Sequence, residues 1–223
     1  MALMDRDWSD LRKRLISSLV LVAVGALELW WGGWPFAVFV ILVTGTMLWE
    51  LWGLTLARGR DGLMFLGLGV ALLIAGQGLL ALRFSPSGLV AVLWLILVVV
   101  ASDTCGYFVG RILGGPKFWP RLSPKKTWSG TIAGWLGAAL VGAVFWAAGV
   151  AGAGLILVSP LVAFAGQIGD ITESWAKRRA GVKDASNLIP GHGGVLDRFD
   201  ALIGATLAMM VLRFAHLLPF EGL

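Results

Sequence analysis

Cysteine and charge are both scarce in this chain of 223 residues. Its single cysteine, Cys105, excludes an internal disulfide framework. Charged residues make up only 14% of the sequence and hydrophobic residues 58%, whereas apolar residues make up roughly 45–50% of a soluble domain. The shortage of charge therefore argues against a soluble globular protein and indicates an integral membrane protein.

Histidine is scarce as well, and it occurs only at positions 192 and 216. Zinc prefers several nitrogen or sulfur ligands, which one cysteine and two separated histidines do not supply. The tryptophans lie mostly in or beside apolar runs, as in an interfacial belt, and not where they would stack nucleic-acid bases. These absences argue against zinc as a cofactor and against nucleic acid as a partner.

Long apolar runs make up most of the remaining sequence. Seven of them approach the roughly 20 residues that a helix needs to cross a membrane, and they lack the alternation of transmembrane strands. The predicted fold is therefore all-α, a polytopic transmembrane helical bundle of about seven spans, at residues 15–31, 35–52, 63–82, 89–109, 130–150, 155–171 and 201–218.

The fifth run carries a stripe of small residues. Gly130, Gly134, Ala138 and Gly142 recur every four residues, which places them on one face of a helix. Because small residues let a second helix approach closely, we expect this stripe to be a packing face.

Lysine and arginine are distributed unevenly around these spans. If the N-terminus lies inside, all but two of the 18 basic residues fall on that side; Arg83 lies outside and Arg213 within the last span. Because cytoplasmic loops carry the excess of basic residues, the N-terminus is predicted to be cytoplasmic. The one-sided basic face suits anionic membrane lipids and nucleotides.

Three polar clusters fall on the same predicted cytoplasmic side, at residues 103–130, 167–173 and 174–200. In the first cluster, Lys125 and Lys126 precede Thr127 and the predicted start of a helix, where backbone donors favour anions. Thr127 or Ser129 is placed to cap that helix. The segment therefore has the residues of a phosphate site.

Carboxylates in the other two clusters indicate a metal. Asp170 ends an apolar run, where an ionised carboxylate needs a partner, a metal or water. Hard cations such as Mg²⁺ prefer carboxylate oxygens and substrate phosphates, so Asp170, Asp197 and Asp200 are candidate ligands. His192 lies among glycines whose backbone can approach a ligand closely, which suggests a hydrogen-bond donor to a phosphate or an orienting group.

Twelve positions of the third cluster match a known signature in residue type and spacing. They are Ser174, Lys177, Arg178, Lys183, Asp184, Pro190, His192, Gly193, Gly194, Asp197, Arg198 and Asp200. On these residues the chain resembles the phosphatidate cytidylyltransferases, also called CDP-diacylglycerol synthases. Residues 123–127 and 167–170 are similar to that family as well, so the resemblance covers about the C-terminal half. Ser129 departs from the pattern, because many members have glutamate there.

The resemblance implies transfer of CMP from CTP to phosphatidic acid, which gives CDP-diacylglycerol and pyrophosphate in phospholipid biosynthesis. The cofactor it implies is Mg²⁺, alone or with a second cation. It also implies a homodimer in the cell (inner) membrane, with the active site facing the cytoplasm. Residues 1–110 would form N-terminal transmembrane helices, and residues 111–223 the catalytic transmembrane region with its cytoplasmic loops.

The resemblance and the chemistry of the side chains together assign roles. The expected catalytic residues are Lys126, Asp170, Arg178, Asp197 and Arg198. The expected substrate-binding residues are Ser123, Lys125, Thr127, Lys177, Lys183, His192, Gly193 and Gly194, and the expected metal ligands are Asp170, Asp197 and Asp200. Since the attacking group is already an oxyanion, we expect positioning and charge neutralisation to carry catalysis.

Two other functions fit parts of this pattern. A CTP-dependent kinase acting on a polyprenol or another lipid alcohol would use the same metal and phosphate groups, with a base to activate the hydroxyl. A membrane transporter would use Glu28, Glu50, Asp103 and Asp170 as an ion path, with polar residues spread through the membrane depth. Here the polar residues gather at one face, apart from Glu28 and Glu50 near span ends.

Overall fold

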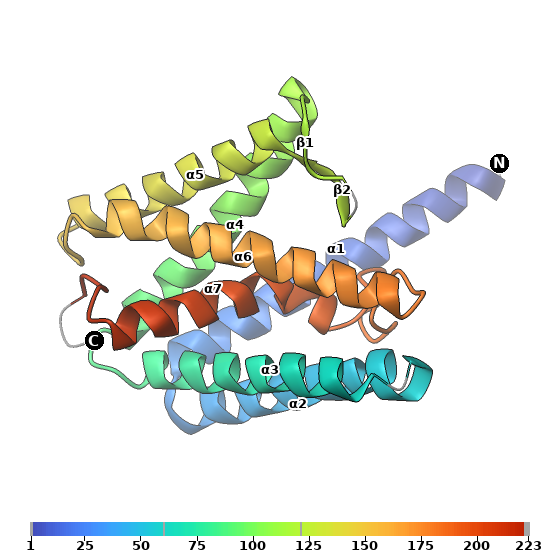
Figure 1. Cartoon of the computed structure of the whole chain (residues 1–223), viewed down its shortest axis with the longest axis horizontal. Helices are drawn as coiled ribbons and strands as arrows, with labels where there is room; N and C mark the ends of the chain where they lie inside the picture. Colours follow the sequence, from blue (N-terminus) through green and yellow to red (C-terminus); the bar gives the residue numbers. More distant parts are fainter. Residues whose placement is uncertain (1, 60, 121, 221–223) are drawn as a thin grey trace. The chain divides into compact units, whose positions relative to one another are not determined.

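The computed structural model describes residues 2–59, 61–120 and 122–220, and for residues 2–11, 13, 58, 59 and 124 it describes the backbone alone. Arg60 and Arg121, which enter the predicted asymmetry of basic residues, lie outside the described residues, as do the side chains of Arg6, Lys13 and Arg58. The chain is mostly helical (Figure 1). Its elements are α1 (Ala2–Trp31), α2 (Gly33–Gly59), α3 (Gly62–Arg83), α4 (Gly88–Leu113), β1 (Lys117–Trp119), β2 (Ser123–Thr127), α5 (Trp128–Ala147), α6 (Leu155–Arg179) and α7 (Leu196–Phe214).

Helices α1 to α6 correspond to the first six apolar runs, although α5 ends at Ala147, before the predicted end of its run at residue 150. Each of these six helices is long and apolar enough to cross a membrane. Many of their large apolar side chains face outward, among them Leu42 (64% exposed), Leu66 (62%) and Leu136 (67%). Apolar surface left in water costs roughly 25 cal/mol per Å², whereas lipid covers it without that cost. The chain is therefore a multi-pass membrane protein.

The seventh predicted span corresponds to α7, which is more polar than the prediction required. The helix begins at Leu196, earlier than predicted, and so takes Asp197, Arg198 and Asp200 into its first turns. Arg213 adds another charge in the last turn. Because of these charges, the helices in the described residues that qualify as membrane spans number six and not seven.

Between α4 and α5 the chain forms a two-stranded antiparallel sheet of β1 and β2, which the all-α prediction missed. The Phe118 ring packs edge-to-face against Trp128, with centroids 4.8 Å apart. Strands of three and five residues are too short to show a periodic apolar pattern, so hydropathy does not reveal them. Figure 1 shows the hairpin at the start of α5, where it places Lys125 and Lys126 just before the helix.

The chain divides into two compact units. The first unit comprises Met1–Leu72 and Ala176–Phe199, and the second comprises Leu73–Trp175 and Asp200–Leu223. The divisions fall inside α3, α6 and α7. In the first unit, Leu51 and Leu54 of α2 are buried. In the second unit, fully buried Trp94 of α4 donates its indole N–H to Ser159 Oγ at 2.9 Å.

In the second unit, the small-residue face of α5 packs closely against α4, which confirms the predicted packing face. A Cβ atom on Gly130 would lie 2.5 Å from the carbonyl oxygen of Gly106, and one on Gly134 would lie 2.8 Å from Ser102 Oγ. Because neither position has room for a side chain, glycine is what allows the two helices to approach. This contact holds the start of α5 against α4.

Replacing Gly142 of α5 by alanine is expected to destabilise the fold. A Cβ atom there would lie 2.5 Å from the carbonyl oxygen of Leu155 and 2.7 Å from Ser159 Oγ, so the helices must shift at a cost of about 1–3 kcal/mol. Thermal unfolding in detergent, followed by tryptophan fluorescence, should show a lower midpoint. Gly45→Ala on α2 is the matched control, because a Cβ atom there meets nothing within 4 Å. Equal midpoints for the two variants would contradict this packing.

Candidate active site

Three carboxylates of the second unit lie close together, and we call them the acid cluster. Asp170 and Glu173 are one turn apart on α6, and Asp200 lies in the first turns of α7. One carboxylate oxygen from each residue lies within 4.8 Å of the other two. Hard divalent cations take oxygen ligands of this kind. The sequence predicts Asp170 and Asp200 as metal ligands but not Glu173.

Two glycines allow the close approach of α6 and α7 that brings the acid cluster together. A Cβ atom on Gly169 would lie 3.1 Å from Gly204 Cα, and one on Gly204 would lie 3.0 Å from Gly169 Cα. Gly169 also faces the carbonyl group of Asp200 directly. A side chain at either glycine would separate the helices, so this contact sets the spacing of the carboxylates.

Lys126 of β2 forms an ion pair with the acid cluster. Its Nζ lies 2.5 Å from Asp170 Oδ2 and donates to the carbonyl oxygen of Gln167 at 3.3 Å. The Lys126 side chain is 23% exposed and that of Asp170 is 34% exposed, so the pair is screened less than one on the open surface. A predicted phosphate-binding cation and a predicted metal ligand thus lie together.

The side chain of Gln167 braces the turn of α6 that carries Asp170. Its Nε2 donates to Ser102 Oγ of α4 at 3.2 Å, and its Oε1 accepts from the indole N–H of Trp135 on α5 at 3.2 Å. Gln167 is buried, where an unpaired amide would cost about 1–3 kcal/mol. The two hydrogen bonds therefore hold α6 in a fixed position against its neighbours in the second unit.

Of the two predicted capping residues, Thr127 and Ser129, Thr127 is the one that caps α5. Its Oγ1 accepts from the N–H of Gly130 at 3.2 Å. Ser129, where the chain departs from the resembled signature, donates to a carbonyl oxygen of the preceding loop at 2.5 Å. Lys125 is exposed and Ser123 is half-buried. Thr127 thus has a structural contact of its own. The predicted substrate-binding roles of Ser123, Lys125 and Thr127 stay predictions.

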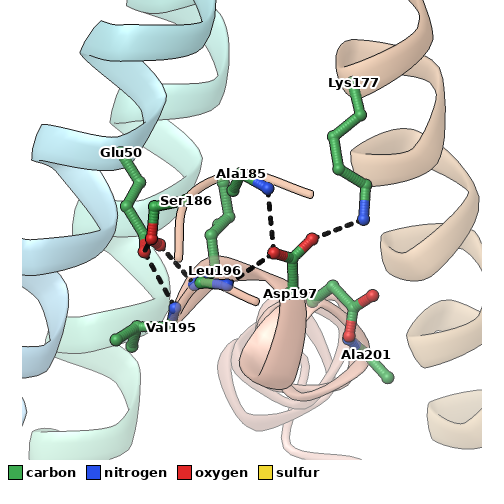
Figure 2. A network of polar contacts seen from close by, with 10 residues as sticks. Glu50, Lys177, Ala185, Ser186, Val195, Leu196, Asp197 and Ala201 are labelled. Carbon is green, nitrogen blue, oxygen red and sulfur yellow. Dashed lines mark hydrogen bonds and ion pairs between the residues drawn. The ribbon is translucent and has the colours of Figure 1, made fainter. Parts of the chain in front are cut away.

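In the first unit, Asp197 lies at the centre of a hydrogen-bond network (Figure 2). Its Oδ1 accepts from Lys177 Nζ at 2.5 Å, and its Oδ2 accepts from the N–H groups of Ala185 at 2.8 Å and Gly194 at 2.7 Å. The side chain is only 2% exposed, and a carboxylate buried to this degree needs such donors. Asp197 therefore orders the loop between α6 and α7; its predicted role as a metal ligand stays a prediction.

Glu50 of α2 holds the other side of the same loop. Its Oε1 accepts from Ser186 Oγ at 2.5 Å and from the N–H of Val195 at 2.9 Å, and its Oε2 accepts from the N–H of Leu196 at 2.6 Å (Figure 2). Glu50 is buried, and a Cβ atom on Gly194 would lie 2.5 Å from its Oε1. The carboxylate also meets the first turn of α7, where the helix dipole favours negative charge.

The same loop forms part of a cavity of about 670 Å³ in the first unit. Lys183, His192, Gly193 and Arg198, all predicted site residues, line it. Arg14 of α1 lines it too, although the sequence indicates for it no more than a topological role. The volume falls within the roughly 300–1,000 Å³ of ligand pockets. The structure thus brings two cations of the signature, Lys183 and Arg198, to one cavity.

The end of α6 carries two further arginines. Arg178, predicted to be catalytic, is exposed. Arg179 donates through Nε to Asp61 Oδ2 at 2.7 Å. The N–H of Met64 and then the Arg179 guanidinium lower the pKa of Asp61 from its usual range. The carboxylate is therefore ionised at neutral pH, and the pair ties the end of α6 to the segment between α2 and α3.

Among the residues of these sites that the transferase prediction left out, three had a sequence signal. Glu50 is an acid within an apolar run, which by itself indicates a buried functional group. Glu173 lies three residues after Asp170, and this spacing puts both on one helix face. Arg14 had the weakest signal, because a basic residue at the end of a membrane span is common.

A model described as the cytidylyltransferase family matches residues 62–216. The phosphatidate cytidylyltransferase of Brucella suis biovar 1 (strain 1330) is 36% identical, over 88% of this chain and 91% of its own length. Those of Rickettsia bellii (strain RML369-C) and Rickettsia conorii (strain ATCC VR-613 / Malish 7) are 34% and 33% identical, over 89% and 94% of both chains. Such coverage extends into the residues before position 62.

Replacing Glu50 by glutamine is expected to loosen the loop between α6 and α7. Both carboxylate oxygens accept N–H groups, so the amide must turn its own NH₂ group toward a donor, at a cost of about 1–3 kcal/mol. Hydrogen exchange measured by mass spectrometry should become faster at Val195 and Leu196. Glu28→Gln on α1 is the control, because it removes the same charge from another membrane helix. Unchanged exchange in Glu50→Gln would show that Glu50 does not order the loop.

Proposed function

The chain belongs to the cytidylyltransferase family, and we propose that it transfers CMP from CTP to phosphatidic acid, giving CDP-diacylglycerol and pyrophosphate. The phosphatidate cytidylyltransferases that match most of its length support this activity. The observation that carries the proposal is the acid cluster with Lys126 beside it, because nucleotidyl transfer needs a divalent cation and a positive charge for the phosphates. The reaction class then follows from the family.

The donor set of the acid cluster fits Mg²⁺. Its ligands are carboxylate oxygens, and Mg²⁺ is usually bound by one or two carboxylates together with substrate phosphates. The ion would be held by Asp170, Glu173 and Asp200. In the ion pair between Asp170 and Lys126, the side chain of Asp170 is the more exposed of the two. When bound, the ion would neutralise charge on the phosphates and polarise their oxygens.

This reaction requires no strong base from the chain. A phosphate oxygen of phosphatidic acid attacks the α-phosphorus of CTP, the bond from that phosphorus to the bridging oxygen breaks, and pyrophosphate leaves with the electron pair. Because the attacking oxygen is already an anion, the chain contributes positioning and neutralisation. Lys126 can pair with a phosphate oxygen when Asp170 serves as a metal ligand. Lys183 and Arg198 offer cations in the cavity of the first unit.

Asp197 and Glu50 take part by ordering the loop that carries Lys183 and His192. Three protein donors already reach Asp197, which favours this positioning role over the metal role that the resemblance implies. The exposed cations Lys125 and Arg178 are proposed to meet substrate phosphates. The cytoplasmic orientation of the site and the homodimer rest on the distribution of basic residues and on the resemblance.

Two of the carboxylates that the transporter alternative would use in its ion path, Glu50 and Asp170, have protein partners. Glu50 accepts three hydrogen bonds from the loop, and Asp170 pairs with Lys126. Carboxylates engaged in this way order the protein, and an ion path would need them to exchange ions. The lipid kinase alternative would use the same metal and phosphate groups, and its reaction products distinguish it from the cytidylyltransferase.

The proposed function is tested by product release from the purified protein in detergent with Mg²⁺ and CTP. Pyrophosphate should appear only when phosphatidic acid is present, together with CDP-diacylglycerol, and a chelator should stop it because the phosphate charges then lack a counter-ion. CDP that appears only with a lipid alcohol would identify a kinase instead. Release that continues in the presence of the chelator would refute the Mg²⁺ requirement.

A further inference from the structure

Helix α1 contacts three consecutive residues of the loop between α6 and α7. Ser17 Oγ donates to the carbonyl oxygen of Pro190 at 3.0 Å and lies 2.8 Å from His192 Nδ1. Gly191 lies against Arg14, since a Cβ atom on Gly191 would be 2.7 Å from Arg14 Cγ. Gly191 also has a φ of 77°, which glycine adopts without strain. The loop and α1 are therefore fitted to each other here.

Two serines of α1 fix the ring of His192. Ser17 Oγ lies 2.8 Å from Nδ1, and Ser18 Oγ lies 3.1 Å from Nε2. Ser17 has one hydroxyl proton, and the carbonyl oxygens of Pro190 and Arg14 lie within reach to accept it, at 3.0 and 3.1 Å. Ser17 and Ser18 contact the two ring nitrogens of His192 from one helix. The serines thus hold the plane of the ring that lines the cavity.

The cavity carries an excess of positive charge. Arg14, Lys183 and Arg198 line it with one carboxylate, Asp184. Guanidinium groups bind phosphate oxygens through paired, charge-assisted hydrogen bonds. A phosphate group is therefore the ligand chemistry that the lining favours.

We infer that Arg14 is a substrate-binding residue whose guanidinium binds a phosphate group, and that Ser17 and Ser18 are positioning residues for His192 in the same cavity. The phosphate belongs to the nucleotide triphosphate or to the lipid phosphomonoester, an identification that rests on the proposed function. Helix α1 precedes residues 62–216, the range that the family model matches. The contacts that α1 makes with the loop place Arg14 at the cavity.

The test compares Arg14→Gln with Arg12→Gln in the purified full-length protein. Arg12 is the matched control, because it is exposed on the same helix and is not among the described residues that line the cavity. Pyrophosphate release is measured with CTP varied at fixed phosphatidic acid, and then with phosphatidic acid varied at fixed CTP.

Arg14→Gln should raise the KM of one substrate about tenfold, because a charge-assisted contact is lost, and the affected substrate identifies the phosphate. Arg12→Gln should leave both KM values near those of the wild type. Two unchanged KM values in Arg14→Gln, or an equal effect of Arg12→Gln, would overturn the assignment of Arg14.

A binding measurement tests the phosphate site at Arg14 independently of the proposed function. If the wild-type protein releases no pyrophosphate with phosphatidic acid, the proposed function fails, and binding of inorganic pyrophosphate is then measured by calorimetry. Binding that weakens about tenfold in Arg14→Gln but not in Arg12→Gln would still support a phosphate site at Arg14. Equal binding in the two variants would remove it.

The positioning role of Ser17 is tested by Ser17→Ala and Ser17→Thr. The alanine variant should raise the same KM as Arg14→Gln, and the threonine variant should restore it because the hydroxyl is kept. A lower unfolding midpoint in Ser17→Ala with both KM values unchanged would show that Ser17 stabilises the fold without positioning the site.

Discussion

A carboxylate held away from water must meet hydrogen-bond donors or a cation, and this requirement shapes both units of the protein. In the first unit it is met by backbone N–H groups. Asp197 and Glu50 lie on opposite sides of the loop between α6 and α7 and together accept from Ala185, Gly194, Val195 and Leu196. The two acids thereby give a defined conformation to a glycine-rich loop, and with it to the cavity that the loop lines.

In the second unit the same requirement is met by charge. Asp170 pairs with Lys126, and the carboxylates of Glu173 and Asp200 lie close enough to share one cation. Such a concentration of negative charge is costly in an apolar protein without a counter-ion. Close helix contacts at Gly169 leave the carboxylates little freedom to separate. The acids of the loop therefore order structure, whereas those of the acid cluster are suited to bind a metal.

Features with local causes could be predicted from the sequence. Apolar runs revealed six membrane helices by length. The capping candidates Thr127 and Ser129 indicated the region where α5 begins, because capping depends on the nearest residues. Features with distant partners could not be predicted: Glu50 meets Val195, and Ser17 meets His192, with no spacing rule to connect them. The hairpin and the early start of α7 were missed for a related reason, since such short segments take their conformation from tertiary contacts and carry no periodic pattern. The signature predicted Lys183 and Arg198, which line the cavity, but not Arg14 of α1, which lines it too.

The most direct test of the acid cluster is its affinity for a divalent cation, measured by electron paramagnetic resonance of Mn²⁺ in competition with Mg²⁺ on the purified protein. We predict one saturable site that weakens about tenfold or more in Asp170→Asn and in Glu173→Gln, as changes at metal sites commonly do. Asp61→Asn should leave it unchanged, because Asp61 pairs with Arg179. Unchanged affinity in Glu173→Gln, with loss in Asp197→Asn, would contradict this assignment and return the metal to the site that the signature implies.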